Sequence, residues 1–123
     1  MAKILIVEDD NILSAAVDTA LKNAGFETLV ATDGVDALKK AYEFVPDLIL
    51  LDLLMPKKPG EDVLSEIRND GVIKNVPIIV SSVKSDPEAI AKCTAMGVSG
   101  YLVKAHYTLD EIVAMVKKVL GVA

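Results

Sequence analysis

Five short apolar runs, spaced regularly along the 123 residues, constrain the fold of this chain more than any other feature. Each run is rich in branched residues and flanked by polar or turn residues, which is typical of a β-strand. The runs cover residues 4–7, 28–31, 48–51, 78–80 and 101–103. The first, third and fourth are apolar throughout, as expected of strands covered on both faces of a parallel sheet. The second and fifth are more polar at their margins, which favours edge positions.

Helical patterns fill the intervals between these runs. Residues 11–24 and 108–120 each place their apolar side chains on one stripe, and three further helices fit at 34–45, 60–70 and 86–96. Thr108 and Glu111 have the spacing of a capping box at the start of the last helix. Four helices are followed by a glycine and an apolar residue, which predicts left-handed helix ends. These glycines are Gly25, Gly71, Gly97 and Gly121.

The order of these elements repeats strand and helix five times. Crossovers of this length join parallel strands through right-handed connections. We therefore expect one α/β domain over residues 1–123, a doubly wound (βα)5 fold whose five-stranded parallel sheet has the order 2-1-3-4-5, as in flavodoxin-like folds. Ligands of such sheets bind beyond the carboxyl ends of the strands, at the switch point between strands 1 and 3.

Composition and charge narrow the classes of function. A hydrophobic content of 52% with 25% charged residues is typical of a globular domain. The net charge of −5 disfavours binding to nucleic acid phosphates. The one cysteine, Cys93, excludes a disulfide framework and a cysteine-rich zinc site. No apolar run approaches the ~20 residues that span a bilayer, and no secretory signal is visible, so we expect a cytoplasmic protein without membrane or nucleic acid partners.

Charged and hydroxyl side chains gather at the predicted carboxyl ends of four strands. They are Glu8, Asp9, Asp10, Asp52, Ser81, Ser82 and Lys104. Two carboxylates ~5 Å apart repel by about 3 kcal/mol at an effective dielectric near 20, and one lysine offsets only one of the charges. Oxygen ligands at a partly open site favour Mg²⁺. A carboxylate on such a metal, beside a lysine and a hydroxyl, is placed to attack a phosphoryl group.

Four segments carry a resemblance to a known family. They are ILIVEDD at 4–10, LDLLMP at 51–56, PIIVSS at 77–82 and GYLVK at 100–104. Together, in this order and spacing, they resemble the CheY-like receiver domain of two-component response regulators. The resemblance covers the whole chain and implies a signalling module, not an enzyme beyond accepting its own phosphoryl group and slowly losing it.

The resemblance implies a role for each residue of the site. Asp52 matches the aspartate that accepts a phosphoryl group from a histidine kinase or phosphotransfer protein. Asp9 and Asp52 would contact Mg²⁺ directly, with the backbone carbonyl of Leu54 as a further ligand and Glu8 acting through water. Lys104 matches the lysine that pairs with the phosphoryl group. Among these acidic residues the neighbouring Asp10 is better explained as a helix cap.

The resemblance also implies a conformational switch. Ser82 matches the hydroxyl that turns toward the phosphoryl group, although Ser81 is a rival by one register. Tyr101 matches the aromatic residue that swings inward, or it packs plainly at the sheet edge. Output would then be protein contact through the face made by the fourth helix, fifth strand and fifth helix, with no output domain on this chain.

Several residues depart from the family pattern. Ala105 follows Lys104 where a cis proline is usual, so we expect a trans peptide and a reshaped loop. Val83 follows Ser82 at a position where the family usually has a small residue, and its bulk would narrow the path for a phosphodonor. Leu54 and Lys84 occupy positions that influence attack by water and are no obvious water-orienting groups, which predicts slow self-dephosphorylation.

These departures leave a rival interpretation open, a degenerate receiver that acts as a phosphorylation-independent binding scaffold. A third class, the aspartate-nucleophile phosphatases, is disfavoured because Leu54 stands where those enzymes carry a second acid.

Overall fold

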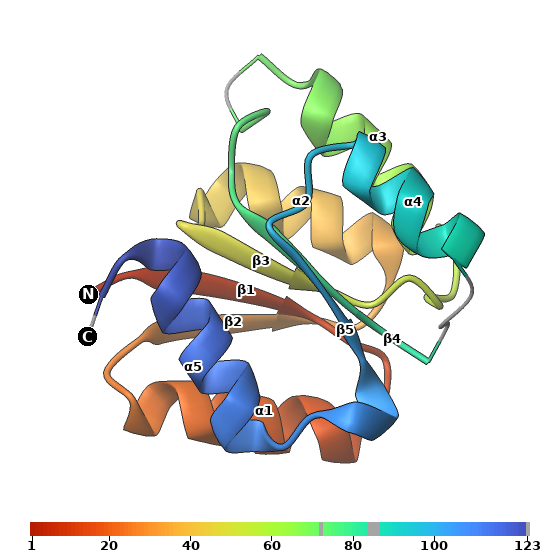
Figure 1. The fold of residues 1–123 in the computed structure, drawn as a ribbon. Helices are drawn as coiled ribbons and strands as arrows, with labels where there is room; N and C mark the ends of the chain where they lie inside the picture. The colour runs from red at the N-terminus through yellow and green to blue at the C-terminus, as the bar shows by residue number, and fades with distance from the viewer. Residues whose placement is uncertain (72, 84–86, 123) are drawn as a thin grey trace.

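The computed structural model describes residues 1–71, 73–83 and 87–122, and its centre is a five-stranded parallel sheet (Figure 1). The strands are β1 (Lys3–Val7), β2 (Glu27–Ala31), β3 (Leu48–Leu51), β4 (Ile78–Ser82) and β5 (Gly100–Val103). Their order is β2-β1-β3-β4-β5, and every neighbouring pair is parallel. The predicted fold class and strand order are therefore confirmed, including the two edge positions.

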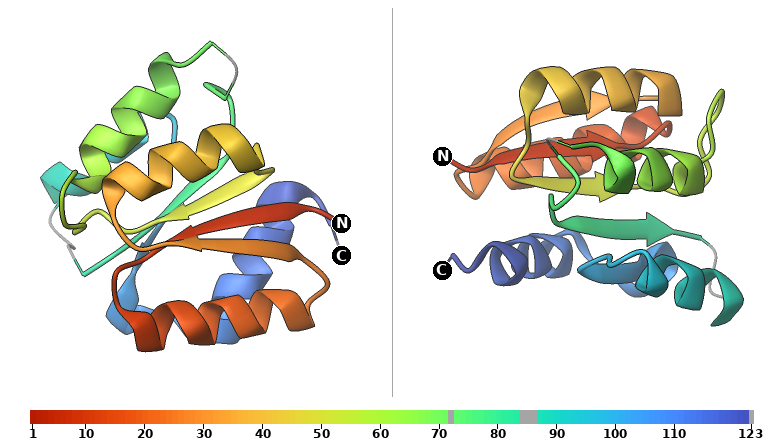
Figure 2. Two further views of the ribbon diagram at one scale, coloured as in Figure 1. Left: turned by 180° about the vertical axis from the view of Figure 1, so that it is seen from behind. Right: turned by 90° about the horizontal axis from the view of Figure 1, so that it is seen from above.

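Helices cover both faces of the sheet (Figure 1 and Figure 2). One face is covered by α1 (Asn11–Asn23) and α5 (Leu109–Leu120), and the other by α2 (Gly34–Phe44), α3 (Gly60–Asn69) and α4 (Pro87–Ala95). A short 3-10 helix, η1 (Lys104–His106), follows β5 and has no counterpart in the sequence prediction. Among the described residues, no helix has the length and apolar character needed to cross a membrane.

Side-chain alternation along the strands divides the interior into two cores. In β1, Leu5 and Val7 belong to the core beneath α2, α3 and α4, whereas Ile4 and Ile6 belong to the core beneath α1 and α5. All four side chains are no more than 1% exposed. A strand that is buried on both faces has no solvent-facing position for a polar side chain, which explains why residues 4–7 are all apolar.

Three of the four predicted left-handed glycines are confirmed, and one prediction is wrong. Gly25, Gly97 and Gly121 have φ values of 96°, 76° and 70°. Gly71 does not have a positive φ, because α3 already ends at Asn69 and Asp70 is extended, with its side chain accepting a hydrogen bond from Ile73 N–H at 3.0 Å. The predicted capping box of α5 is confirmed in both directions.

The loop after β3 is packed closely against the first residues of two helices. Gly60 N–H donates to the carbonyl of Leu53 at 2.9 Å, and Gly34 N–H donates to the carbonyl of Pro56 at 3.3 Å. A Cβ atom at Gly34 would lie 2.1 Å from the carbonyl oxygen of Lys58. The two glycines thus allow the loop that begins at β3 to run directly against α2 and α3.

Candidate functional site

The sheet brings the predicted site residues together at one end, because the carboxyl ends of all its parallel strands lie there. Glu8 follows β1, Asp52 follows β3 and Lys104 follows β5. Backbone hydrogen bonds continue the sheet through the first two positions: Glu8 N–H donates to Ala31 O and Asp52 N–H donates to Val7 O, each at 3.0 Å. The backbone of both carboxylate residues is therefore fixed by the sheet and not by a free loop.

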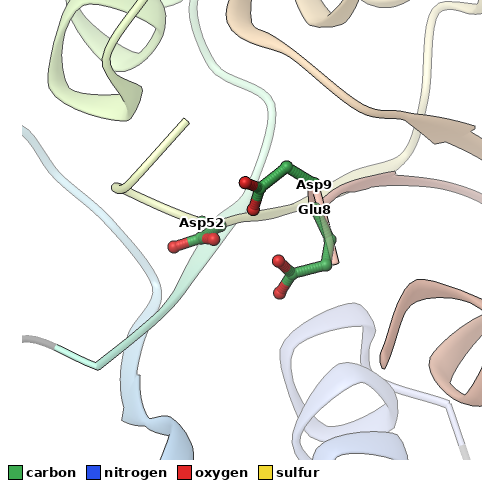
Figure 3. A group of neighbouring side chains, drawn as sticks. All are labelled: Glu8, Asp9 and Asp52. Atoms are coloured by element: carbon green, nitrogen blue, oxygen red, sulfur yellow. The ribbon is translucent and has the colours of Figure 1, made fainter. Parts of the chain in front are cut away.

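Three carboxylates form one cluster at this end (Figure 3). One oxygen from each of Glu8, Asp9 and Asp52 lies within 4.8 Å of the others. Asp52 is 3% exposed and Glu8 is 6% exposed, whereas Asp9 is open to solvent. The cluster has a buried floor and one solvent-facing acid, which leaves it accessible from outside.

Lys104 lies between the two buried carboxylates. Its Nζ donates to Glu8 Oε1 at 2.5 Å and to Asp52 Oδ2 at 3.1 Å. The second oxygen of each carboxylate accepts from the backbone: Glu8 Oε2 from Asp10 N–H at 3.2 Å, and Asp52 Oδ1 from Leu54 N–H at 3.1 Å. Every oxygen of the two buried carboxylates therefore has a donor.

Burial and charge shift the proton affinities of this group. Burial, together with the negative charge of Asp52, raises the pKa of Glu8 to about 7, although the hydrogen bond from Lys104 opposes the shift. For Lys104, burial disfavours the charged form, but the hydrogen bond to Glu8 and the charge of Asp52 outweigh it and raise its pKa. One ammonium cannot neutralise three carboxylates, so the site favours a further cation.

The donor set fits a divalent metal ion. Carboxylate oxygens are hard ligands, and Mg²⁺ binds through one or two carboxylates while it keeps several waters. Asp9 is the carboxylate of the cluster that is exposed to solvent. Leu54, whose carbonyl the family resemblance implies as a further ligand, is 46% exposed and lies two residues after Asp52 in the chain.

The two predicted switch residues, Ser82 and Tyr101, lie on the face of the sheet that α2, α3 and α4 cover. Val80 belongs to the core beneath α2, α3 and α4, and alternation places Ser82, which is fully buried, on that same face. Tyr101, half-buried, packs against the same core. Ser81 instead lines a cavity that Asp52 and Lys104 also border. The shared face favours Ser82 as the partner of Tyr101, whereas Ser81 borders the same cavity as Asp52 and Lys104.

The remaining sequence predictions concern single residues. Asp10 caps α1, accepting from Ile12 N–H at 3.0 Å and Leu13 N–H at 3.1 Å, as predicted. No peptide bond within the described ranges is cis, so the predicted trans bond before Ala105 is confirmed. Val83 is 61% exposed, and Lys84 lies outside the described residues.

One residue of the site region was not predicted from the sequence. Gly60 approaches the backbone of Asp52 and Leu53 so closely that no side chain fits between them. The available signal was a glycine directly after Pro59 at the start of a predicted helix. Neither residue type names a packing partner, so the close approach becomes visible only in three dimensions.

Curated proteins with similar sequences include bacterial regulators. Regulator of RpoS from Escherichia coli (strain K12) is 37% identical over 114 residues, which are 93% of this chain and 33% of that protein. Transcriptional regulatory protein PrrA from Mycobacterium tuberculosis is 36% identical over 118 residues, 96% of this chain and 49% of that protein. This chain thus spans one third to one half of the length of these relatives.

Solved structures of similar fold cover the chain almost completely. Chemotaxis response regulator CheY4 of Vibrio cholerae has a TM-score of 0.89 and 31% identity, over 97% of this chain and 98% of that one. The Mn²⁺-bound form of response regulator Rcp1 has a TM-score of 0.88 and 27% identity, over 100% of this chain and 97% of that one. The sequence profile of the response regulator receiver domain matches residues 4–117. With five parallel strands in the predicted order and an acidic cluster at their carboxyl ends, the chain belongs to the response regulator receiver domain family.

Proposed function

We propose that the chain accepts a phosphoryl group on Asp52, with Mg²⁺, from a histidine kinase or phosphotransfer protein, and passes the signal on by protein contact. The observation that carries this proposal is the placement of one buried carboxylate, that of Asp52, against the ammonium of Lys104 and the carboxylates of Glu8 and Asp9. A nucleophile, a cation for the phosphoryl oxygens and a metal-binding pair are thus collected in one place.

Each residue of the cluster has a separate task in this reaction. A carboxylate oxygen of Asp52 attacks phosphorus while the bond from phosphorus to the histidine nitrogen breaks, and the electron pair leaves with the imidazole. Lys104 is placed to pair with a phosphoryl oxygen. Asp9, Asp52 and the Leu54 carbonyl would hold Mg²⁺, with Glu8 acting through water. When bound, the metal supplies positive charge that neutralises the reacting oxygens.

The signal would leave the site through Ser82 and Tyr101, which lie toward the face of the sheet covered by α2, α3 and α4. Tyr101 packs against the core that includes Cys93 of α4, and alternation along β4 places Ser82 on the same face of the sheet. A turn of the Ser82 hydroxyl toward the phosphoryl group would open space for Tyr101 and shift a pre-existing equilibrium of the surface made by α4, β5 and α5. That surface would then contact a downstream protein target.

The phosphoacceptor assignment is tested by intact-mass measurement. Incubation with a small-molecule phosphodonor and Mg²⁺ is expected to add the mass of one phosphoryl group to the wild-type protein. Asp52→Ala and Asp52→Asn should both lose this gain, because neither side chain can form the acyl phosphate. A wild-type protein without any mass gain would instead support the phosphorylation-independent scaffold, and a gain that survives in both variants would place the phosphoryl group elsewhere.

The phosphorylated protein is expected to lose its phosphoryl group slowly. Leu54 presents an aliphatic side chain that is 46% exposed, which cannot orient water by hydrogen bonding. Replacing it by a polar side chain, Leu54→Asn, should shorten the half-life severalfold. The half-life is measured by following the phosphorylated mass after removal of the phosphodonor. A wild-type half-life of seconds, or no change in Leu54→Asn, would contradict this prediction.

Two matched serine variants test the switch. Ser82→Ala is expected to keep phosphorylation of Asp52 but to lose the accompanying change in the NMR signals of Tyr101. Ser81→Ala removes the neighbouring hydroxyl, which lies on the other face of the sheet, and should keep that response. The opposite pattern, in which only Ser81→Ala loses the response, would move the switch role to Ser81.

A further inference from the structure

A mostly apolar cavity lies beside the acidic site, on the face of the sheet covered by α1 and α5. Its volume is about 310 Å³, large enough to hold a small molecule. Its floor is formed by Ile6, Leu50 and Leu102, which are at most 4% exposed, and its walls include Leu13 of α1 and Ile112 of α5. The cavity thus lies between the sheet and these two helices, near the carboxyl ends of the strands.

The charged groups of the site form the polar end of this cavity. Glu8, Asp52 and Lys104 all line it, and Lys104 contacts both carboxylates. The carboxylates of Asp9 and Asp52 outnumber the single ammonium of Lys104 even where Glu8 keeps its proton, so this end of the cavity has a net negative charge. An apolar chamber with a few polar groups at one end is the usual form of a small-molecule site. The sign of the charge selects a cationic occupant.

We propose that the cavity binds a small organic cation. Its ammonium or amidinium head would lie against Glu8 and Asp52, where it competes with Lys104, and a short apolar tail would lie between Leu13 and Ile112. A carboxylate head would be repelled by the net negative charge, and a neutral head would lack the charge-assisted hydrogen bond. The proposal goes beyond phosphorylation and does not depend on it, because it concerns the unphosphorylated, metal-free protein.

Three probes with the same tail and different heads separate charge from hydrophobicity. Hexylamine, hexanol and hexanoate are titrated into methyl-labelled protein in the presence of a chelator, and NMR follows the methyl signals of Leu13 and Ile112. Hexylamine is expected to shift these signals saturably and to bind about fivefold or more tightly than hexanol, with hexanoate the weakest. Equal affinity for hexylamine and hexanol would overturn the cationic assignment.

A pair of tryptophan variants locates the binding. Leu13→Trp fills the cavity and should weaken hexylamine binding about tenfold or more. Leu120→Trp is the matched control, because Leu120 is also a half-buried leucine packed on the same core but does not line the cavity. If thermal melts show that Leu13→Trp is unfolded, Leu109→Trp blocks the cavity from a position that is 37% exposed. Hexylamine binding that neither folded cavity variant weakens would overturn the proposed site.

Discussion

Replacement of Gly60 by alanine is expected to destabilise the protein by about 3 kcal/mol. The added Cβ atom would lie 2.4 Å from the carbonyl oxygen of Asp52 and 2.5 Å from the Cα atom of Leu53. Both are backbone atoms, so no rotation of a side chain can relieve the contact. The backbone of Asp52 is also held by its hydrogen bond to Val7, and the strand end resists displacement. Any shift that does occur moves Asp52, the proposed phosphoacceptor.

Gly71→Ala is the matched control for this effect. A Cβ atom at Gly71 meets no atom within 4 Å, and the residue is exposed and does not have a positive φ. Its substitution should change the unfolding free energy by no more than about 0.5 kcal/mol. Denaturant unfolding measures both variants, and the mass assay reports phosphoryl acceptance by any folded Gly60→Ala protein. If Gly60→Ala matches Gly71→Ala in stability, the close packing of α3 against the backbone of Asp52 and Leu53 is refuted.

The architecture could be predicted because its signals are local and repeated. Each strand is a short branched run, each helix has its own apolar stripe, and the polar margins of the second and fifth runs correctly predicted the edges of the sheet. The error at Gly71 has a different origin. Asp70 closes the turn with its own side chain, a choice that the glycine signal alone does not reveal.

The candidate site could be predicted in composition but not in its interactions. The convergence of Glu8, Asp52 and Lys104 follows from topology, because all strands of the sheet are parallel and their carboxyl ends lie on the same side. That Lys104 contacts Glu8 as well as Asp52 depends on side-chain directions and burial. The close approach of Gly60 and the cavity between α1 and α5 depend on helix packing distances, which no sequence pattern encodes.

Replacement of Lys104 by methionine is expected to cost about 3 kcal/mol of stability in the metal-free protein at pH values above 7. The change leaves two buried carboxylates, Glu8 and Asp52, without the cation that both contact. Lys22→Met is the matched control, since it breaks a surface ion pair with Asp18 at 2.9 Å, and such pairs contribute about 1 kcal/mol or less. Denaturant unfolding in a chelator compares the two variants.

The pH dependence of this loss distinguishes a charge effect from lost packing. In the wild type, burial raises the pKa of Glu8 from 4.5 to about 7, so the native state keeps a proton that the unfolded chain has released between these values. Stability therefore falls as pH rises through this window and levels off above it.

Without Lys104 the pKa of Glu8 rises further, because a hydrogen bond that favoured the ionised form is gone. The stability of the variant therefore continues to fall above pH 7. Below pH 7 a protonated Glu8 leaves only one buried negative charge, and the difference between variant and wild type should shrink. A difference that stays constant across this range would show that Lys104 stabilises the site through its aliphatic chain and not through its charge.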